Sequence, residues 1–180
     1  MKTIEKYLQS DDLRYFPKLL GEKVRYIYSN SLHVDLNQHI YESNSFSLYS
    51  KKCFLNFQTF WLDFDDYEYY KLNITQSATP KGISRDNMGA LMNPSKIIIA
   101  PETNIVKIEL FEDKDEEEWN SRGRELITVK YDSALLFSQS DGNKFLIGVS
   151  ETIADLTQFI RHEQATNARL EGLSKRLEWK

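Results

Sequence analysis

Hydrophobic and polar residues alternate with a period of two along most of the chain between residues 24 and 149. This spacing is typical of strands that bury one face. Two such runs within residues 24–36 flank Ser29-Asn30-Ser31, which predicts a hairpin. Residues 54–62 are apolar on both faces and predict a central strand. The turn-forming pair Asp65-Asp66 then predicts an antiparallel return strand over residues 69–74.

Turn signals divide the second half of the chain into further strands. Asp141-Gly142 lies between apolar runs at residues 134–137 and 144–149, and this dipeptide predicts a tight hairpin, because a primed turn needs positive φ. The acidic run at residues 112–118 separates two alternating segments and predicts a solvated loop.

Both ends of the chain have helical spacing. Ile4, Tyr7 and Leu8 predict short N-terminal helices within the first 20 residues. From Ser150, a good N-cap, the spacing predicts a C-terminal amphipathic helix over about residues 150–178. Its apolar stripe is interrupted from Arg161 onward, so we expect the second half to project or to lie in a separate groove.

These elements predict a single α+β domain over residues 1–180. Its centre is a strongly curved antiparallel sheet of about seven to ten strands built from hairpins, with the short N-terminal helices and the C-terminal helix packed on it. Residues 77–95 are expected to form a long irregular loop, because they hold two of the four prolines and two of the seven glycines. Long connections of this kind tend to be functional or mobile.

Composition narrows the classes of function. The net charge is −4, which argues against binding the phosphates of nucleic acid and suits a basic protein partner. One cysteine cannot form an internal disulfide, and no apolar segment is long enough for a signal peptide or a membrane span. We therefore expect a cytoplasmic protein that does not enter a membrane.

The residues able to carry chemistry do not form a known motif. H-E-x-x-H, G-x-S-x-G, the P-loop and C-x-x-C are all missing from the sequence. The candidates weighed are His33, His39, His162, Cys53, and the carboxylates Asp63, Asp65, Asp66 and Glu68. We expect a buried thiol, a solvated carboxylate turn, and neither metal nor cofactor. Catalysis stays an open question, with a non-enzymatic role favoured, because catalytic groups also assemble from distant positions.

The leading hypothesis is a small protein-binding domain without catalytic activity, most concretely an immunity-type protein that neutralises a toxin by direct contact. The predicted partner-binding residues are the acidic segment Glu116, Glu117, Glu118 and Trp119, together with the cations Lys81, Arg85, Arg161 and Arg169. One alternative is a small-ligand-binding protein or enzyme with an aromatic-lined cavity under the curved sheet, gated by residues 77–95. A second alternative is a nucleic-acid accessory factor. The oligomeric state is left open.

Overall fold

The computed structural model describes residues 2–50, 52–64, 67–119, 125–150 and 155–180, and within these ranges the side chains of 63, 64, 67, 117–119 and 125 lie outside the description. The described strands are β1 (Lys2–Lys6), β2 (Tyr26–Ser29), β3 (His33–Asp35), β4 (Ile40–Ser43), β5 (Phe46–Ser50), β6 (Cys53–Phe64), β7 (Tyr67–Ser77), β8 (Ser95–Ile98), β9 (Ile105–Trp119), β10 (Glu125–Gln139), β11 (Lys144–Val149), β12 (Thr157–Ile160) and β13 (Ser174–Trp179). The helices are α1 (Ser10–Leu13), α2 (Phe16–Leu19) and α3 (Glu163–Leu170).

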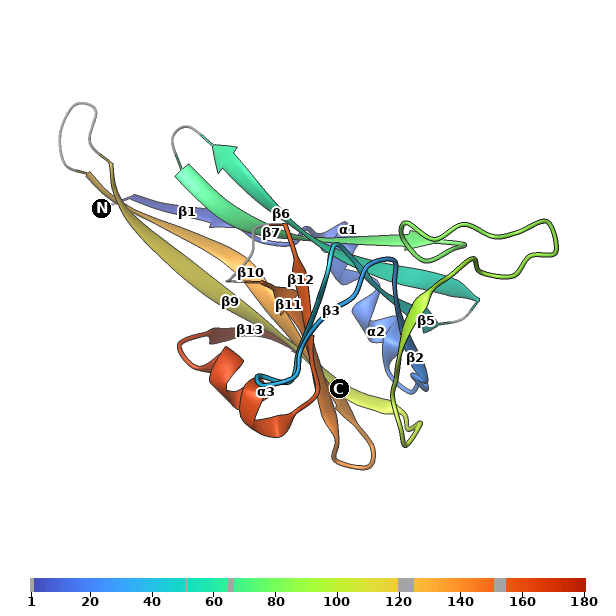
Figure 1. The fold of residues 1–180 in the computed structure, drawn as a ribbon. Helices are drawn as coiled ribbons and strands as arrows, with labels where there is room; N and C mark the ends of the chain where they lie inside the picture. Colours follow the sequence, from blue (N-terminus) through green and yellow to red (C-terminus); the bar gives the residue numbers. More distant parts are fainter. Residues whose placement is uncertain (1, 51, 65–66, 120–124, 151–154) are drawn as a thin grey trace.

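Eight strands form the larger sheet, in the order β13-β9-β10-β11-β12-β4-β3, with β1 beside β10. The two 15-residue strands β9 and β10 make a long ribbon through it (Figure 1). β1 pairs in parallel with residues 127–131 of β10, and β11 pairs with residues 134–138 along the same strand. Since β13 pairs with β9, both ends of the chain are fastened to this ribbon.

The smaller sheet has five strands, in the order β7-β6-β5-β2-β8, and all its neighbours are antiparallel. Its longest pair confirms the predicted hairpin, because Leu62 lies opposite Tyr69 and Phe57 opposite Ile74. The predicted turn at residues 65–66 lies outside the described residues.

The main core lies between the two sheets. Phe57 of the smaller sheet meets Phe137 of the larger one edge to face, with ring centroids 6.3 Å apart. Phe46 and Phe159 make a second contact between the sheets at 5.9 Å. A separate apolar cluster on the outer face of the larger sheet packs under α3, formed by Ala134, Leu136, Leu146 and Ile160 with Ala165 and Leu170.

The prediction of a β-rich α+β chain with antiparallel sheets is confirmed. The prediction of one strongly curved sheet is wrong, because the strands divide between two sheets and neither is strongly curled in the described residues. The Asp141-Gly142 hairpin is confirmed between β10 and β11, and its positive φ, 87°, is at Gly142.

The C-terminal amphipathic helix predicted over residues 150–178 is wrong. That segment contains β12, the eight-residue α3 and β13, while residues 151–154 lie outside the described part. All four residues of β12 are buried, on both faces of the strand, so the short segment has no hydrophobic period that distinguishes a strand from a helix. The segment after Arg161 does not project as a helix, because residues 174–179 pair with β9.

Pairing with distant strands also explains three further differences from the sequence predictions. The short N-terminal helices are confirmed as α1 and α2, each of four residues, but the first residues with helical spacing, around Ile4, belong to strand β1. The hairpin within residues 24–36 does not form, since β2 and β3 belong to different sheets. The acidic run at 112–118 is not a loop but part of β9.

Candidate functional site

The connection between β7 and β8, residues 78–94, stands clear of the sheets on the right of Figure 1. It is fastened at its base, where the Lys81 amide donates hydrogen bonds to Ser47 Oγ at 3.1 Å and to Asn56 Oδ1 at 3.0 Å. Gly82, at φ 71°, passes so close to Asn30 that any Cβ would overlap its side chain. The base of the connection is therefore docked on the smaller sheet.

The outer part of this connection, residues 84–92, forms a miniature hairpin that we call the projecting loop. Arg85 and Leu91 form an isolated bridge across it. Asp86 Oδ1 accepts hydrogen bonds from the Met88 amide at 2.9 Å and the Ala90 amide at 2.8 Å. These bonds are local, so the loop holds its shape without help from the sheets.

Two methionines make the surface of the projecting loop unusually apolar. Met88 is 94% exposed and Met92 is 51% exposed. The guanidinium of the predicted partner residue Arg85 donates to the carbonyls of Gly89 and Ala78 and thereby holds the loop. The exposed surface of the projecting loop is therefore formed by methionine more than by cation, a feature that sequence reasoning based on charge did not find.

The acidic segment of β9 lies elsewhere, on the long ribbon. Glu116 is exposed and forms an ion pair with Lys114 at 2.8 Å. Glu112 lies 3.7 Å from Lys130 of the neighbouring strand. Glu117, Glu118 and Trp119 belong to β9 by backbone, and their side chains lie outside the described residues. The described acids of this segment are thus interleaved with lysines.

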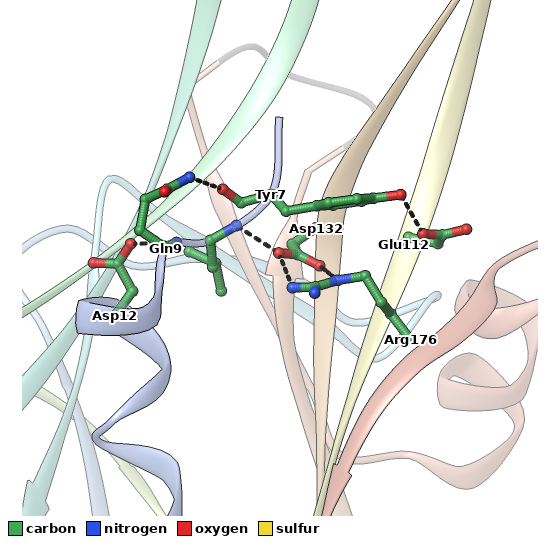
Figure 2. Close-up of polar contacts among 7 residues, drawn as sticks. Tyr7, Gln9, Asp12, Glu112, Asp132 and Arg176 are labelled. Carbon is green, nitrogen blue, oxygen red and sulfur yellow. Dashed lines mark hydrogen bonds and ion pairs between the residues drawn. The ribbon is translucent and has the colours of Figure 1, made fainter. Parts of the chain in front are cut away.

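Near the middle of this ribbon, a buried ion pair joins both ends of the chain to β10 (Figure 2). Asp132 is 2% exposed and accepts hydrogen bonds from Arg176 Nη2 at 2.6 Å and from the Leu8 amide at 2.7 Å. Burial raises the pKa of the Asp132 carboxyl above its usual value, although Arg176 and the Leu8 amide lower it. Arg176 also lies over the ring of Tyr7, and that hydroxyl donates to Glu112 at 2.7 Å. Burial and this bond to a carboxylate raise the Tyr7 pKa.

A second feature is a cavity of about 480 Å³ on the outer face of the larger sheet. It lies between the turn before β4, strand β12 and helix α3, so residues 77–95 do not gate it. Polar side chains contribute to its lining, with the amides and imidazoles of Asn37, Gln38, His39, Gln158, His162 and Gln164. This cavity is therefore not the aromatic-lined cavity of the sequence hypothesis, which stays a prediction.

Two of the three histidines meet at this cavity. The rings of His39 and His162 stack with centroids 4.2 Å apart and planes 16° from parallel. His39 takes a positive φ of 57° in the turn before β4, and His162 is the residue that precedes α3. Their separation of more than one hundred residues made the pairing invisible in the sequence.

The floor of the cavity contains a buried amide. Gln158 is 4% exposed, and its Nε2 donates to Glu42 Oε1 at 3.1 Å. The same carboxylate oxygen accepts a bond from Ser150 Oγ at 2.6 Å. On the other side of the amide, Gln158 Oε1 has no hydrogen-bond partner among the described residues.

The two remaining predicted cations flank or enter this region. Arg169 is only 9% exposed, lines the cavity, and donates to Ser133 Oγ at 2.7 Å and to the Val149 carbonyl. Arg161 donates to the Ala100 carbonyl at 2.5 Å. Among the predicted partner residues whose side chains are described, the structure therefore does not gather all on one surface.

The described residues contain no group of three or more His, Cys, Asp or Glu side chains placed to hold a metal ion. Among the helices in the described ranges, none has the length and apolar character needed to cross a membrane. The thiol of Cys53, predicted to be buried, is only half-buried. Its sulfur accepts a hydrogen bond from Gln76 Nε2.

No family model, curated protein or solved structure matches the chain.

Proposed function

We propose that the chain is a small cytoplasmic protein-binding domain, most concretely an immunity-type protein that neutralises a toxin by direct contact. The observation that supports it is the projecting loop, which exposes Met88 almost completely. An apolar side chain at the tip of an ordered projection gains free energy when a partner removes it from water. Methionine also adapts to the shape of the surface it meets.

The internal bonds of the projecting loop favour binding. A loop that is ordered before contact loses little conformational entropy on association, so more of the contact energy appears as affinity. The Asp86 side chain provides this order by accepting two backbone amides. The negative net charge of the chain adds long-range attraction toward a basic partner.

The acidic end of the β9–β10 ribbon supplies a secondary contact in this proposal. Glu116 is the last acid of this end whose side chain is described, and it is exposed. It forms an ion pair with Lys114. An exposed ion pair of this kind contributes to association rate and register more than to affinity. We therefore place the main contact at Met88 and Met92.

A growth-protection assay tests this proposal. The products of the genes adjacent to this one are expressed inducibly in a bacterial host, with and without the chain. We expect one of them to arrest growth and the natural chain to restore it. If no adjacent product is both toxic and bound by the chain, the immunity role is wrong.

Two variants locate the contact in the same assay. Met88→Asp combined with Met92→Asp is expected to abolish protection, because it puts two carboxylates where a partner excludes water. Leu36→Asp is the matched control, since Leu36 is 78% exposed and lies in a turn elsewhere on the surface. Protection by the double variant equal to that of the natural chain would place the contact outside the projecting loop.

A further inference from the structure

We propose that the outer face of the smaller sheet binds a proline-rich segment of a partner protein in the extended polyproline II conformation. The site is a groove of about 370 Å³ that we call the tyrosine groove. Its three tyrosines are Tyr26 and Tyr28 of β2 and Tyr49 of β5. This proposal does not depend on the immunity role or on the contact at Met88.

The alternation of the strands turns these three side chains away from the core. Ile27 is fully buried in the main core, so Tyr26 and Tyr28 on either side of it point outward. Tyr49 follows the fully buried Leu48 in the same way. Tyr49 is 46% exposed, and the other two tyrosines are half-buried. A ligand can therefore reach all three side chains from solvent.

The rings form ridges and not a flat surface. Tyr28 meets Phe54 with centroids 5.5 Å apart and planes inclined by 85°. Tyr49 meets the same ring at 4.9 Å and 51°, and Tyr26 meets Tyr28 at 5.9 Å and 62°. Phe54 is 3% exposed, so it lies beneath the tyrosines. Grooves between aromatic side chains are the sites where proline-rich segments dock.

The phenol hydroxyls provide hydrogen-bond donors for the backbone of such a segment. Burial raises the pKa of the Tyr28 hydroxyl, and the neighbouring phenols of Tyr26 and Tyr49 raise it further, so this hydroxyl stays protonated. Within the described residues, no hydrogen bond engages the three hydroxyls. A polyproline II segment has no internal hydrogen bonds, so its carbonyls are free to accept from them.

The charges at the groove favour an uncharged ligand. Two carboxylates, Glu22 and Glu102, and two cations, Lys23 and Arg25, are among the lining residues. Arg25 lies 4.0 Å from Glu102, so the two signs are interleaved. An anion or a cation would meet groups of its own sign as well as groups of the opposite sign. Proline side chains carry no charge and avoid this conflict.

A single-stranded nucleic acid fits the groove less well, because it needs several ring faces on which successive bases stack. Lys96 Nζ lies 5.6 Å from the ring centre of Tyr26 and 5.8 Å from that of Tyr28. The Arg25 guanidinium lies 5.1 Å from the ring centre of Tyr26. Among the described residues, Tyr49 has no such cation over its ring. One uncovered ring is enough for a proline but does not make a platform for several bases.

The groove adjoins two further features of the same sheet face. Ser47 lies opposite Tyr28, and its Oγ accepts the Lys81 amide at the base of the connection that carries the projecting loop. Ile98 lies opposite Tyr26 on the edge strand β8 and is 64% exposed. A partner whose proline-rich segment lies in the groove thus has an apolar contact at Ile98 beside it.

The test is an NMR titration of the full chain with a synthetic oligoproline peptide. A Gly-Ser peptide of the same length, an oligothymidylate and tetramethylammonium chloride are titrated in parallel. We expect oligoproline alone to give saturable shifts, confined to the groove and its neighbours in β2, β5 and β8. The proposal is overturned if oligoproline does not saturate, if the Gly-Ser peptide binds equally well, or if only oligothymidylate or tetramethylammonium saturates.

Tyr28→Phe tests the hydroxyl donor, because it keeps the ring and removes the oxygen. We expect its dissociation constant for oligoproline to rise about threefold or more. Tyr41→Phe is the matched control, since Tyr41 is also half-buried but lies on β4 of the larger sheet and does not line the groove. Its affinity is expected to stay within about twofold of the natural chain.

Tyr49→Ala removes the most exposed of the three rings. We expect it to weaken oligoproline binding about tenfold, because the ring supplies contact area for a proline. Tyr28→Phe keeps the test decisive if Tyr49→Ala does not fold. Affinities of both variants equal to that of the natural chain would show that the peptide does not bind in the tyrosine groove.

Discussion

The projecting loop and the acidic segment of β9 are both segments where the sequence predicts a loop and a partner contact, yet the structure builds them in opposite ways. The loop is held by short-range hydrogen bonds. The Asp86 side chain accepts two backbone amides, and both lie within four residues of Asp86 in the sequence. The acidic segment is held by pairing along its length with β10. Removing the local bonds of the loop should therefore change the loop alone, whereas side-chain changes in the acidic segment leave its backbone pairing in place.

The largest effect is expected where the ribbon is fastened. Asp132→Ala removes the carboxylate that binds Arg176 and the Leu8 amide, and it leaves both donors without their partner. Breaking one side of a buried ion pair typically costs about 3 kcal/mol of unfolding free energy. Urea unfolding followed by circular dichroism measures this loss. A loss no larger than that of an exposed substitution would mean that the junction does not hold the ribbon.

The same carboxyl makes stability depend on pH. Because burial raises the Asp132 pKa above 3.8, the native chain holds this proton more tightly than the unfolded chain does. Its contribution is fully present below pH 3.8 and is lost as the pH rises through the native pKa. Asp132→Asn does not titrate at this position and serves as the reference.

The measured quantity is the unfolding free energy of the natural chain minus that of Asp132→Asn, followed from pH 3.5 to about 7. We expect this difference to fall as the pH rises. A difference that rises with pH would show that Arg176 and the Leu8 amide outweigh burial.

A smaller effect is expected in the projecting loop. Asp86→Ala removes both loop-closing acceptor bonds but no contact with either sheet. We expect the unfolding free energy to change by less than about 0.5 kcal/mol, as for an exposed substitution. Trypsin cleavage after Arg85 should become several times faster, because the loop opens more often. Unchanged cleavage would show that Asp86 does not order the loop.

The smallest effect is expected for Glu116→Lys in β9. The ion pair with Lys114 is solvent-exposed on both sides, and such pairs contribute little. Thermal unfolding should be nearly unchanged, since backbone pairing with β10 carries this segment. A clear drop in the unfolding temperature would show that charge pairing, and not the ladder, maintains the end of the ribbon.

The difference between local and distant contacts also explains which sequence predictions succeeded. Residues 112–116 have no apolar alternation of their own, but Ile127, Val129 and Tyr131 in the partner strand do. The acidic segment therefore forms a strand because it pairs with β10, and the sequence of the acidic segment alone cannot show this pairing. The β6–β7 and β10–β11 hairpins were predictable because their strands are adjacent in sequence and joined by recognisable turns.

The candidate sites followed the same division. The long connection could be placed from its prolines and glycines, but the role of Arg85 as a loop clasp and the exposure of Met88 depend on the fold. The cavity combines Gln38 and His39 with Gln158 and His162, which come together only through pairing of β12 with β4. Charge, the main guide in the sequence, does not reveal any of these contacts.

The most direct test of the central claim is photo-crosslinking in the native cell from a benzoylphenylalanine placed at position 88, compared with one placed at position 116. Both positions are exposed, so the probe can meet a partner at either one. We predict a discrete protein adduct from position 88 and a weaker one or none from position 116. An adduct from position 116 without one from position 88 would contradict the assignment of the partner contact to the projecting loop.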